Sequence, residues 1–166
     1  DLMRSLGVEV VTSADLVQQF EAVWDGAQLA SHQVAAEGLR AIVDEAFGFV
    51  GTSLAAGHAL TEYGLQQYIL SRMQARGLVT SSPPIAAVNA HSADPHYGPA
   101  AEGSAPIRQG DLVLIDLWAK QPAPGAVYAD ITWTGFVGRT VPARHQDIFQ
   151  IVRRARDAAV TFVQGR

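Results

Sequence analysis

Two apolar segments joined by a short polar stretch decide the fold of this chain: Leu112-Val-Leu-Ile-Asp-Leu-Trp118 and Val127-Tyr-Ala-Asp-Ile-Thr-Trp133. Both are rich in β-branched and aromatic residues, which is typical of strands, and the second continues to Val137. The intervening Gln121-Pro-Ala-Pro-Gly125 cannot continue a strand because proline lacks the N–H that a ladder needs. We therefore expect two strands, 112–118 and 127–137, connected by a turn.

Each of these strands carries one carboxylate among apolar neighbours, Asp116 in the first and Asp130 in the second. A carboxylate in such a setting loses hydration and needs a partner, a raised pKa or a bound cation. A hairpin turn centred near Ala123 predicts that Asp116 lies directly opposite Asp130, with Cβ atoms roughly 4.5–5.5 Å apart. A divalent cation between two such like charges would turn their repulsion into a binding site. The same register pairs Leu114 with Thr132 and Trp118 with Tyr128.

A structural interpretation of the two aspartates stays open at this point. One could cap a turn while the other meets an arginine. A slip of one residue in the register would also place the two carboxylates on opposite faces of the sheet, because side chains alternate with a period of two.

Helices are predicted on both sides of this hairpin. Asp25 and Gln28 form a capping-box pattern that starts a long helix ending near Phe49, and Pro142 suits the first turn of a last helix. The chain is therefore of the α+β class, with helices packed on a sheet that contains an antiparallel hairpin. The remaining expected segments are a strand at 8–11, a short helix after Thr12 or Ser13, a loop at 51–57, a helix from Thr61 to Gly77, a strand at 85–88 and a loop at 89–110. Leu29, Ala36, Val43, Ala46 and Phe47 are expected to form the buried stripe of the long helix, and Ile148, Val152, Ala155, Ala159 and Phe162 the apolar stripe of the last one.

Composition excludes several classes of protein. The 166 residues include 48% hydrophobic and 17% charged residues, so the chain can bury a core and is not a disordered tail. Its net charge of −4 and sequence pI near 5.7 argue against nucleic acid as a partner. Cysteine is absent, which excludes disulfides and thiolate metal sites. No apolar run approaches the ~20 residues of a membrane helix, so no membrane partner is expected.

A histidine in a constrained loop is the third candidate. His96 lies in Asp94-Pro-His-Tyr-Gly-Pro99, and loops of this kind often carry working side chains. A histidine there could donate to a developing oxyanion or move a proton. His91 is close in sequence and could compete for the role, and a purely structural histidine is the alternative.

Taken together, these motifs resemble the M24 "pita-bread" metallopeptidases, and within them the Xaa-Pro aminopeptidase and Xaa-Pro dipeptidase branch. The resemblance rests on Pro95-His-Tyr97, Ile107-Arg-Gln-Gly-Asp111, Leu114-Ile-Asp-Leu-Trp-Ala119 and Tyr128-Ala-Asp-Ile-Thr-Trp-Thr134. It implies that residues 1–12 end a preceding domain and that residues 13–166 form the N-terminal half of the pita-bread catalytic domain. The chain is accordingly expected to be a piece of a longer polypeptide, and to be inactive by itself.

The resemblance also implies roles for individual residues. Asp116 and Asp130 correspond to metal ligands, with Asp130 bridging two divalent ions, and His96 corresponds to a catalytic histidine that binds substrate. Thr132 falls where a threonine often supports the ligands. The remaining ligands, one His and two Glu, would come from a C-terminal half that the chain lacks. Manganese is the preferred ion, and cobalt or zinc would also fit. The implied partner is a peptide with proline at the second position, the implied location is the cytoplasm, and a homodimer is left open.

Two departures from the family pattern bear on the substrate. Trp118 stands where the family usually has glycine, and Trp133 where it usually has arginine. The leading hypothesis is a metal-dependent exopeptidase that hydrolyses Xaa-Pro bonds. The alternatives are a non-catalytic pita-bread binding module and a creatinase-like amidinohydrolase, and the two retained aspartates favour the enzyme over both.

Overall fold

An antiparallel sheet in the order β1-β2-β3 carries the two candidate aspartates. The computed structural model describes residues 2–165. The strands are β1 (Ile85–Val88), β2 (Leu112–Ala119) and β3 (Ala129–Phe136). The helices are α1 (Leu2–Ser5), α2 (Ala14–Glu21), α3 (Gly26–Ala55), α4 (Glu62–Ala75) and α5 (Ala143–Gln164), and a 3-10 helix, η1 (Asn89–Ala93), follows β1. The α+β class and the hairpin-containing sheet are as predicted.

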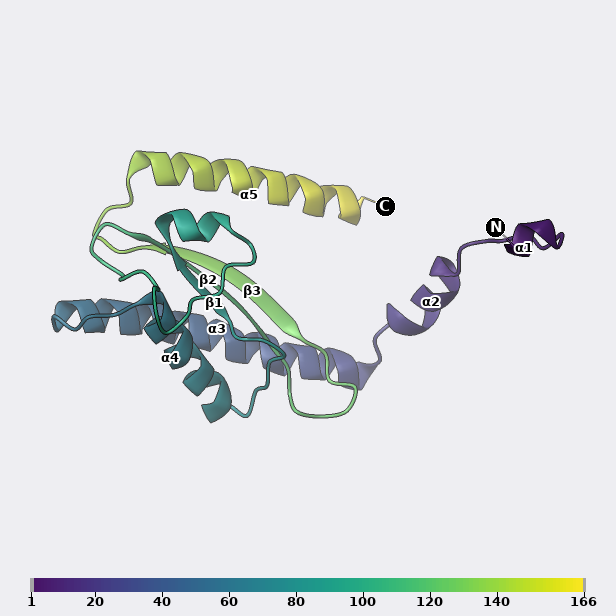
Figure 1. Cartoon of the computed structure of the whole chain (residues 1–166), viewed down its shortest axis with the longest axis horizontal. Helices are drawn as coiled ribbons and strands as arrows, with labels where there is room; N and C mark the ends of the chain where they lie inside the picture. Colours follow the sequence, from purple (N-terminus) through teal and green to yellow (C-terminus); the bar gives the residue numbers. More distant parts are fainter. Residues whose placement is uncertain (1, 166) are drawn as a thin grey trace.

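One face of the sheet packs against α3 and α4, while α5 lies on the other side of the sheet from α3 (Figure 1). In β2 the side chains alternate between the two faces: Val113, Ile115, Leu117 and Ala119 are buried, and the residues between them are partly exposed. Burying an aliphatic side chain of this size stabilises a fold by roughly 1.5–3 kcal/mol. This alternation fixes which face of β2 is the core face and leaves Asp116 on the other one.

The core is completed by the two helices under the sheet. Their buried side chains include Leu39, Ile42, Val43 and Ala46 of α3 and Leu65, Ile69 and Met73 of α4. Gly135 of β3 lets α3 approach closely, because a Cβ at that position would lie 2.6 Å from Cε1 of Phe47. Gly77 ends the turn after α4 at φ +65°, a backbone conformation that glycine adopts without strain.

The predicted register of the hairpin is wrong by two residues. Asp116 pairs with Thr132, and Trp118 pairs with Asp130. The turn is therefore centred one residue later than Ala123. A shift of two residues preserves the face of every side chain, so Asp116 and Asp130 still share one face, as diagonal neighbours.

The long helix is longer than predicted. Its capping box is present: the amide N of Gln28 donates to Oδ1 of Asp25 at 2.7 Å, and the amide N of Asp25 donates to Oε1 of Gln28 at 2.8 Å. Residues 51–55, expected to be a loop, continue α3, because Val50 and Ser53 are buried and hold its last turns against the core. Leu29, expected in the buried stripe, is exposed near the start of the helix.

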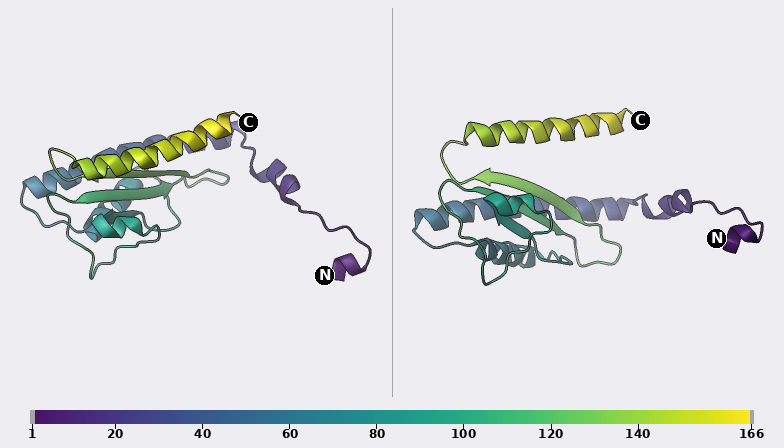
Figure 2. Two further views of the ribbon diagram at one scale, coloured as in Figure 1. Left: turned by 90° about the horizontal axis from the view of Figure 1, so that it is seen from above. Right: turned by 45° about the horizontal axis from the view of Figure 1, so that its top comes forward.

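The two ends of the chain differ most from the expectations. Residues 8–11 form no strand and are exposed, because no neighbouring strand offers hydrogen bonds to them. Together with α1 and α2 they extend away from the sheet (Figures 1 and 2). The apolar stripe predicted for α5 is present in sequence but exposed, with Ile148, Val152 and Phe162 all open to solvent. Near its start α5 approaches the sheet, where His145 lies 5.7 Å from Phe136 between ring centroids. No helix in the described part of the chain is long and apolar enough to cross a membrane.

Candidate active site

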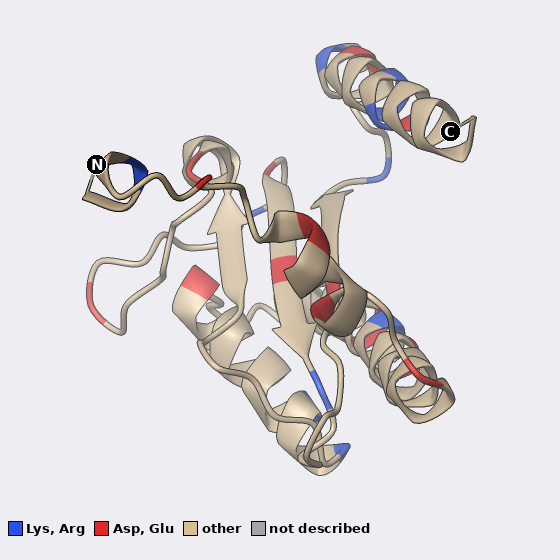
Figure 3. Ribbon diagram, turned by 90° about the vertical axis from the view of Figure 1, so that its right-hand side faces the viewer, with Lys and Arg blue, Asp and Glu red and all other residues tan. Residues whose placement is uncertain are grey.

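Asp116 and Asp130 are the two charged residues of the three strands, and both project from the sheet face that α3 and α4 leave uncovered. Figure 3 shows the acidic positions in red and the basic ones in blue along the chain. Asp116 is half-buried and Asp130 is exposed. Among the ion pairs of residues 2–165, none joins either aspartate to an arginine or lysine. The structural alternative, in which an arginine neutralises one of them, therefore finds no support.

Thr132 holds the carboxylate of Asp116. It lies directly across from Asp116 on β3, and its Oγ1 donates a hydrogen bond to Asp116 Oδ1 at 2.6 Å. A hydroxyl donating to a carboxylate is a short, charge-assisted contact that limits how the carboxylate can rotate. The family resemblance implies a supporting role for Thr132, and this contact is the kind of interaction that such a role requires.

The two aspartates repel each other. Although Asp130 is exposed as a residue, partial loss of hydration around its carboxyl raises its pKa above the ordinary value, and the negative charge of Asp116 raises it further. The Cβ atoms of diagonal neighbours in an antiparallel sheet lie roughly 7–8 Å apart or slightly less. The two carboxylates can therefore approach the same point in space above the sheet. A cation bound between the carboxylates would offset this repulsion.

The donor set fits part of a metal centre. Carboxylate oxygens suit hard divalent cations such as Mn²⁺. Within residues 2–165, however, no group of three or more His, Asp or Glu side chains gathers closely enough to hold an ion. The described residues therefore offer two candidate ligands, Asp116 and Asp130, and a metal centre built on them would need further ligands.

His96 is exposed, in a turn after η1. Its amide N donates to Asp94 Oδ1 at 2.9 Å, and the amide N of Tyr97 donates to the carbonyl oxygen of Asp94 at 3.1 Å. These bonds fix the backbone of the turn and leave the imidazole available to a ligand. His96 forms no metal-binding cluster with the two aspartates in residues 2–165, so its catalytic role stays a prediction.

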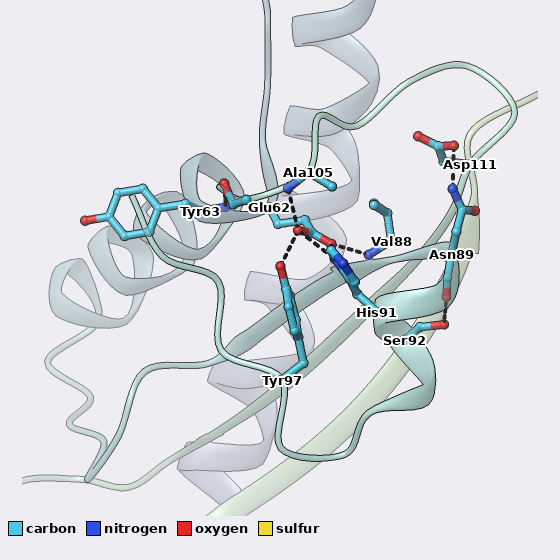
Figure 4. Close-up of polar contacts among 10 residues, drawn as sticks. Glu62, Tyr63, Val88, Asn89, His91, Ser92, Tyr97, Ala105 and Asp111 are labelled. Carbon is cyan, nitrogen blue, oxygen red and sulfur yellow. Dashed lines mark hydrogen bonds and ion pairs between the residues drawn. The ribbon is translucent and has the colours of Figure 1, made fainter. Parts of the chain in front are cut away.

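Sequence reasoning missed Glu62, which the structure places at the centre of a buried hydrogen-bond network (Figure 4). Glu62 is the first residue of α4 and has no solvent exposure. Burial by itself raises the pKa of its carboxyl, but hydrogen bonds from Tyr97, Val88, His91 and Ala105 outweigh that effect and leave the pKa below its usual value. In sequence Glu62 is indistinguishable from an acidic residue in the first turn of any helix, so no local signal reveals it.

The two unusual tryptophans lie on opposite faces of the sheet. Trp118 shares the face of Asp116 and pairs with Asp130. Trp133 pairs with Ile115 on the face toward α3, where the guanidinium carbon of Arg40 lies 5.2 Å from its ring centroid. Trp118 therefore borders the candidate site, and Trp133 belongs to the packing of α3 on the sheet.

Comparison with known proteins decides the family. A family model described as "Metallopeptidase family M24" matches residues 28–165. The chain belongs to metallopeptidase family M24. This confirms the family predicted from the motifs around Asp116 and Asp130, which lie within the matched region. Among curated protein sequences, none matches the chain.

Solved structures support the same assignment for this M24 chain. It is 26% identical to the dipeptidase PepE from Mycobacterium ulcerans, with a TM-score of 0.65 over 87% of this chain and 36% of that one. It is also 26% identical to an X-prolyl aminopeptidase from Caenorhabditis elegans, described as a cytosolic enzyme with a di-nuclear active site, with a TM-score of 0.66 over 78% of this chain and 21% of that one. A dipeptidase from Pyrococcus horikoshii OT3 shares the fold, with a TM-score of 0.68 at 19% identity over 95% of this chain and 48% of that one. The M24 chain thus spans less than half the length of each.

Proposed function

We propose that the full-length protein containing this chain is a metal-dependent exopeptidase that hydrolyses Xaa-Pro peptide bonds. The observation that carries the proposal is the pair of unneutralised carboxylates, Asp116 and Asp130, on one open face of the sheet of an M24 chain. Two of the similar solved structures are a dipeptidase and an X-prolyl aminopeptidase, which favours a short peptide with proline at the second position as substrate.

In this proposal Asp116 and Asp130 would hold two divalent ions, with Mn²⁺ preferred over Co²⁺ or Zn²⁺. When bound, such ions supply Lewis acidity and lower the pKa of a water. Thr132 keeps the Asp116 carboxylate oriented, and His96 donates a hydrogen bond to the carbonyl oxygen on which charge develops. The remaining ligands lie outside residues 2–165, so the 166-residue chain alone binds Mn²⁺ weakly and turns over no substrate.

The proposal extends to the cellular location and the oligomeric state of the protein. The C. elegans relative is described as cytosolic, and we place this protein in the cytoplasm by analogy. A homodimer is the assembly we would test first, by measuring the mass of the full-length protein in solution.

The test compares Xaa-Pro and Xaa-Ala dipeptides and tripeptides as substrates of the full-length protein. Hydrolysis should require Mn²⁺, stop with EDTA and favour proline at the second position. Asp130→Asn should abolish it, because an amide is neutral and a poorer ligand for a hard cation. The matched control is Asp44→Asn on α3, where the carboxylate is 71% exposed and does not belong to the candidate site. Near-normal rates in Asp130→Asn would overturn the assignment.

The same assays separate the alternatives. Peptide binding without turnover at any metal concentration would indicate a binding module. Metal-independent release of urea from a guanidino substrate would indicate an amidinohydrolase.

A further inference from the structure

A single buried carboxylate joins four separate segments of the chain. Oε1 of Glu62 accepts hydrogen bonds from the amide N of Val88 at 2.8 Å and from Nδ1 of His91 at 2.9 Å. Oε2 accepts from Oη of Tyr97 at 2.5 Å and from the amide N of Ala105 at 2.8 Å. The amide N of Glu62 in turn donates to the carbonyl oxygen of Ala105 at 3.0 Å. Figure 4 shows these donors converging on the carboxylate from different sides.

The four donors all belong to the stretch that leads from β1 to β2. Val88 ends β1, His91 lies in η1, and Tyr97 and Ala105 lie in the long connection that follows. That connection has no helix or strand between Asp94 and Asp111, so it is held by individual contacts, among them the backbone bonds of residues 105–107 to the start of α4 and the side-chain bonds to Glu62. The position of Glu62 at the start of α4 adds the favourable field of a helix N-terminus to its negative charge.

Tyr97 is held from two directions. Its hydroxyl donates to Glu62, and its ring stacks on the imidazole of His91, with centroids 4.4 Å apart and planes 26° apart. Because His91 also contacts the Glu62 carboxylate, the three side chains orient one another. The next residue toward the N-terminus of Tyr97 is His96, whose imidazole is exposed. Fixing Tyr97 therefore fixes the backbone from which His96 projects.

We propose that Glu62 and Tyr97 are positioning residues for His96: the carboxylate of α4 anchors the Tyr97 hydroxyl and thereby holds the neighbouring imidazole in its working place. The catalytic half of this inference rests on the proposed function, whereas the ordering of the loop does not. If Glu62 were merely a structural anchor, weakening it would lower stability without affecting the step that depends on His96.

The test uses Tyr97→Phe in the full-length protein, because phenylalanine keeps the ring stack and removes only the hydroxyl. Misplacing a catalytic group by about 1 Å can cost on the order of 100-fold in rate, so we expect kcat to fall about 10- to 100-fold while KM changes less than about threefold. Tyr63→Phe is the matched control: it makes the same change one residue from Glu62, and the Tyr63 ring points away from the network (Figure 4). Its kcat should stay within about twofold of the wild type.

A double variant separates positioning from general damage. If Tyr97 acts through His96, Tyr97→Phe should cause little further loss in a His96→Ala background, because the group it positions is gone. Equal losses in both backgrounds would overturn the positioning role. If the wild-type protein cleaves Xaa-Pro peptides and His96→Ala strongly lowers kcat, unchanged kcat in Tyr97→Phe would contradict this inference and leave the proposed function standing.

A readout independent of activity is hydrogen exchange at the turn. The amides of His96 and Tyr97 both bond to Asp94, so their exchange measures the order of this turn directly. We expect exchange to accelerate at least about tenfold in Tyr97→Phe and to stay unchanged in Tyr63→Phe. If exchange is the same in both variants, the inference is wrong, whether or not the protein proves to be an Xaa-Pro peptidase.

Discussion

Thr132, not Asp130, stands directly across the hairpin from Asp116, and its hydroxyl donates to the Asp116 carboxylate at 2.6 Å. Asp130 lies one position further along the same face, opposite Trp118. The site is therefore a diagonal pair of carboxylates with a threonine beside one of them. This arrangement holds Asp116 in one orientation and leaves Asp130 more exposed and less restrained.

Removing one of the two like charges should stabilise the protein when no metal is present. We expect Asp130→Asn to raise the free energy of unfolding in EDTA by about 0.2–0.5 kcal/mol, a small gain because solvent screens exposed charges. Urea unfolding measures it, and the gain should shrink in high salt. Asp44→Asn, which removes a charge paired with Arg40, should give no such gain. A destabilised Asp130→Asn variant would show that the repulsion is not the dominant effect.

Thr132→Val should weaken metal binding while leaving the fold intact. Valine has nearly the same shape but cannot donate to Asp116, and losing a group that orients a metal ligand typically costs about 10- to 100-fold in affinity. Calorimetric titration of the full-length protein with Mn²⁺ measures this. Thr134→Val is the matched control, because Thr134 lies on the same face but opposite Leu114. Equal affinities in both variants would contradict a role for the Thr132 hydroxyl.

The two tryptophans should respond differently to truncation. Trp118→Ala removes a large side chain next to Asp130, so we expect an altered KM and altered preference among Xaa-Pro peptides. Trp133→Ala should mainly lower stability, because this ring packs on the α3 side beside Arg40. Steady-state kinetics with a peptide series, together with thermal unfolding, distinguishes the two. A changed substrate preference in Trp133→Ala alone would reverse our assignment of the faces.

Tyr97 should ionise at higher pH than a free tyrosine. Burial, the hydrogen bond to the Glu62 carboxylate and the negative charge of that group together raise its pKa to about 12. Because the folded-state pKa is raised, the stabilisation is fully present below an unfolded value near 10 and is lost as pH rises through about 12. Ultraviolet titration should show a tyrosine ionisation near pH 12 that Tyr97→Phe removes. If Tyr97→Phe leaves this ionisation in place, Tyr97 is not its source.

Glu62 should contribute stability that acid removes. Its pKa is lowered in the fold, so its contribution is present above an unfolded value of roughly 4.3 and is lost as pH falls through the lower folded value. Glu62→Gln replaces one carboxylate oxygen, an acceptor surrounded by donors, with an NH₂ group that can only donate. We expect this to lower the free energy of unfolding by about 2 kcal/mol or more at pH 7. The difference in free energy of unfolding between Glu62→Gln and the wild type should become smaller below pH 4. Glu102→Gln, an exposed position, should have no comparable effect.

The hairpin shows how far a sequence pattern reaches. Its strands and the shared face of Asp116 and Asp130 were predictable from residues 112–137, because side-chain direction alternates strictly along a strand. The resemblance to the M24 family also rested on the motifs at 95–97 and 107–111. The register was predicted two residues away from the observed one. Turn geometry and packing against α3 set the register, and the pattern of apolar residues predicts neither of them.

Errors elsewhere have the same origin. Helix α3 runs through Gly51 to Ala55 because Val50 and Ser53 find a core to pack against, although the local composition favours a loop. Residues 8–11 have strand-forming side chains but no strand to pair with. In both places tertiary contacts overrode local preference.

The sequence by itself determined the strands β2 and β3, the capping box at Asp25, and the motifs that resemble metallopeptidase family M24, because each depends on spacing along the chain. Only the tertiary structure decided that Thr132 supports Asp116, that Trp118 and Trp133 face opposite ways, and that Glu62 binds the turn carrying His96. These contacts join residues far apart in sequence, and a buried carboxylate acquires its partners only when separate segments are brought together around it.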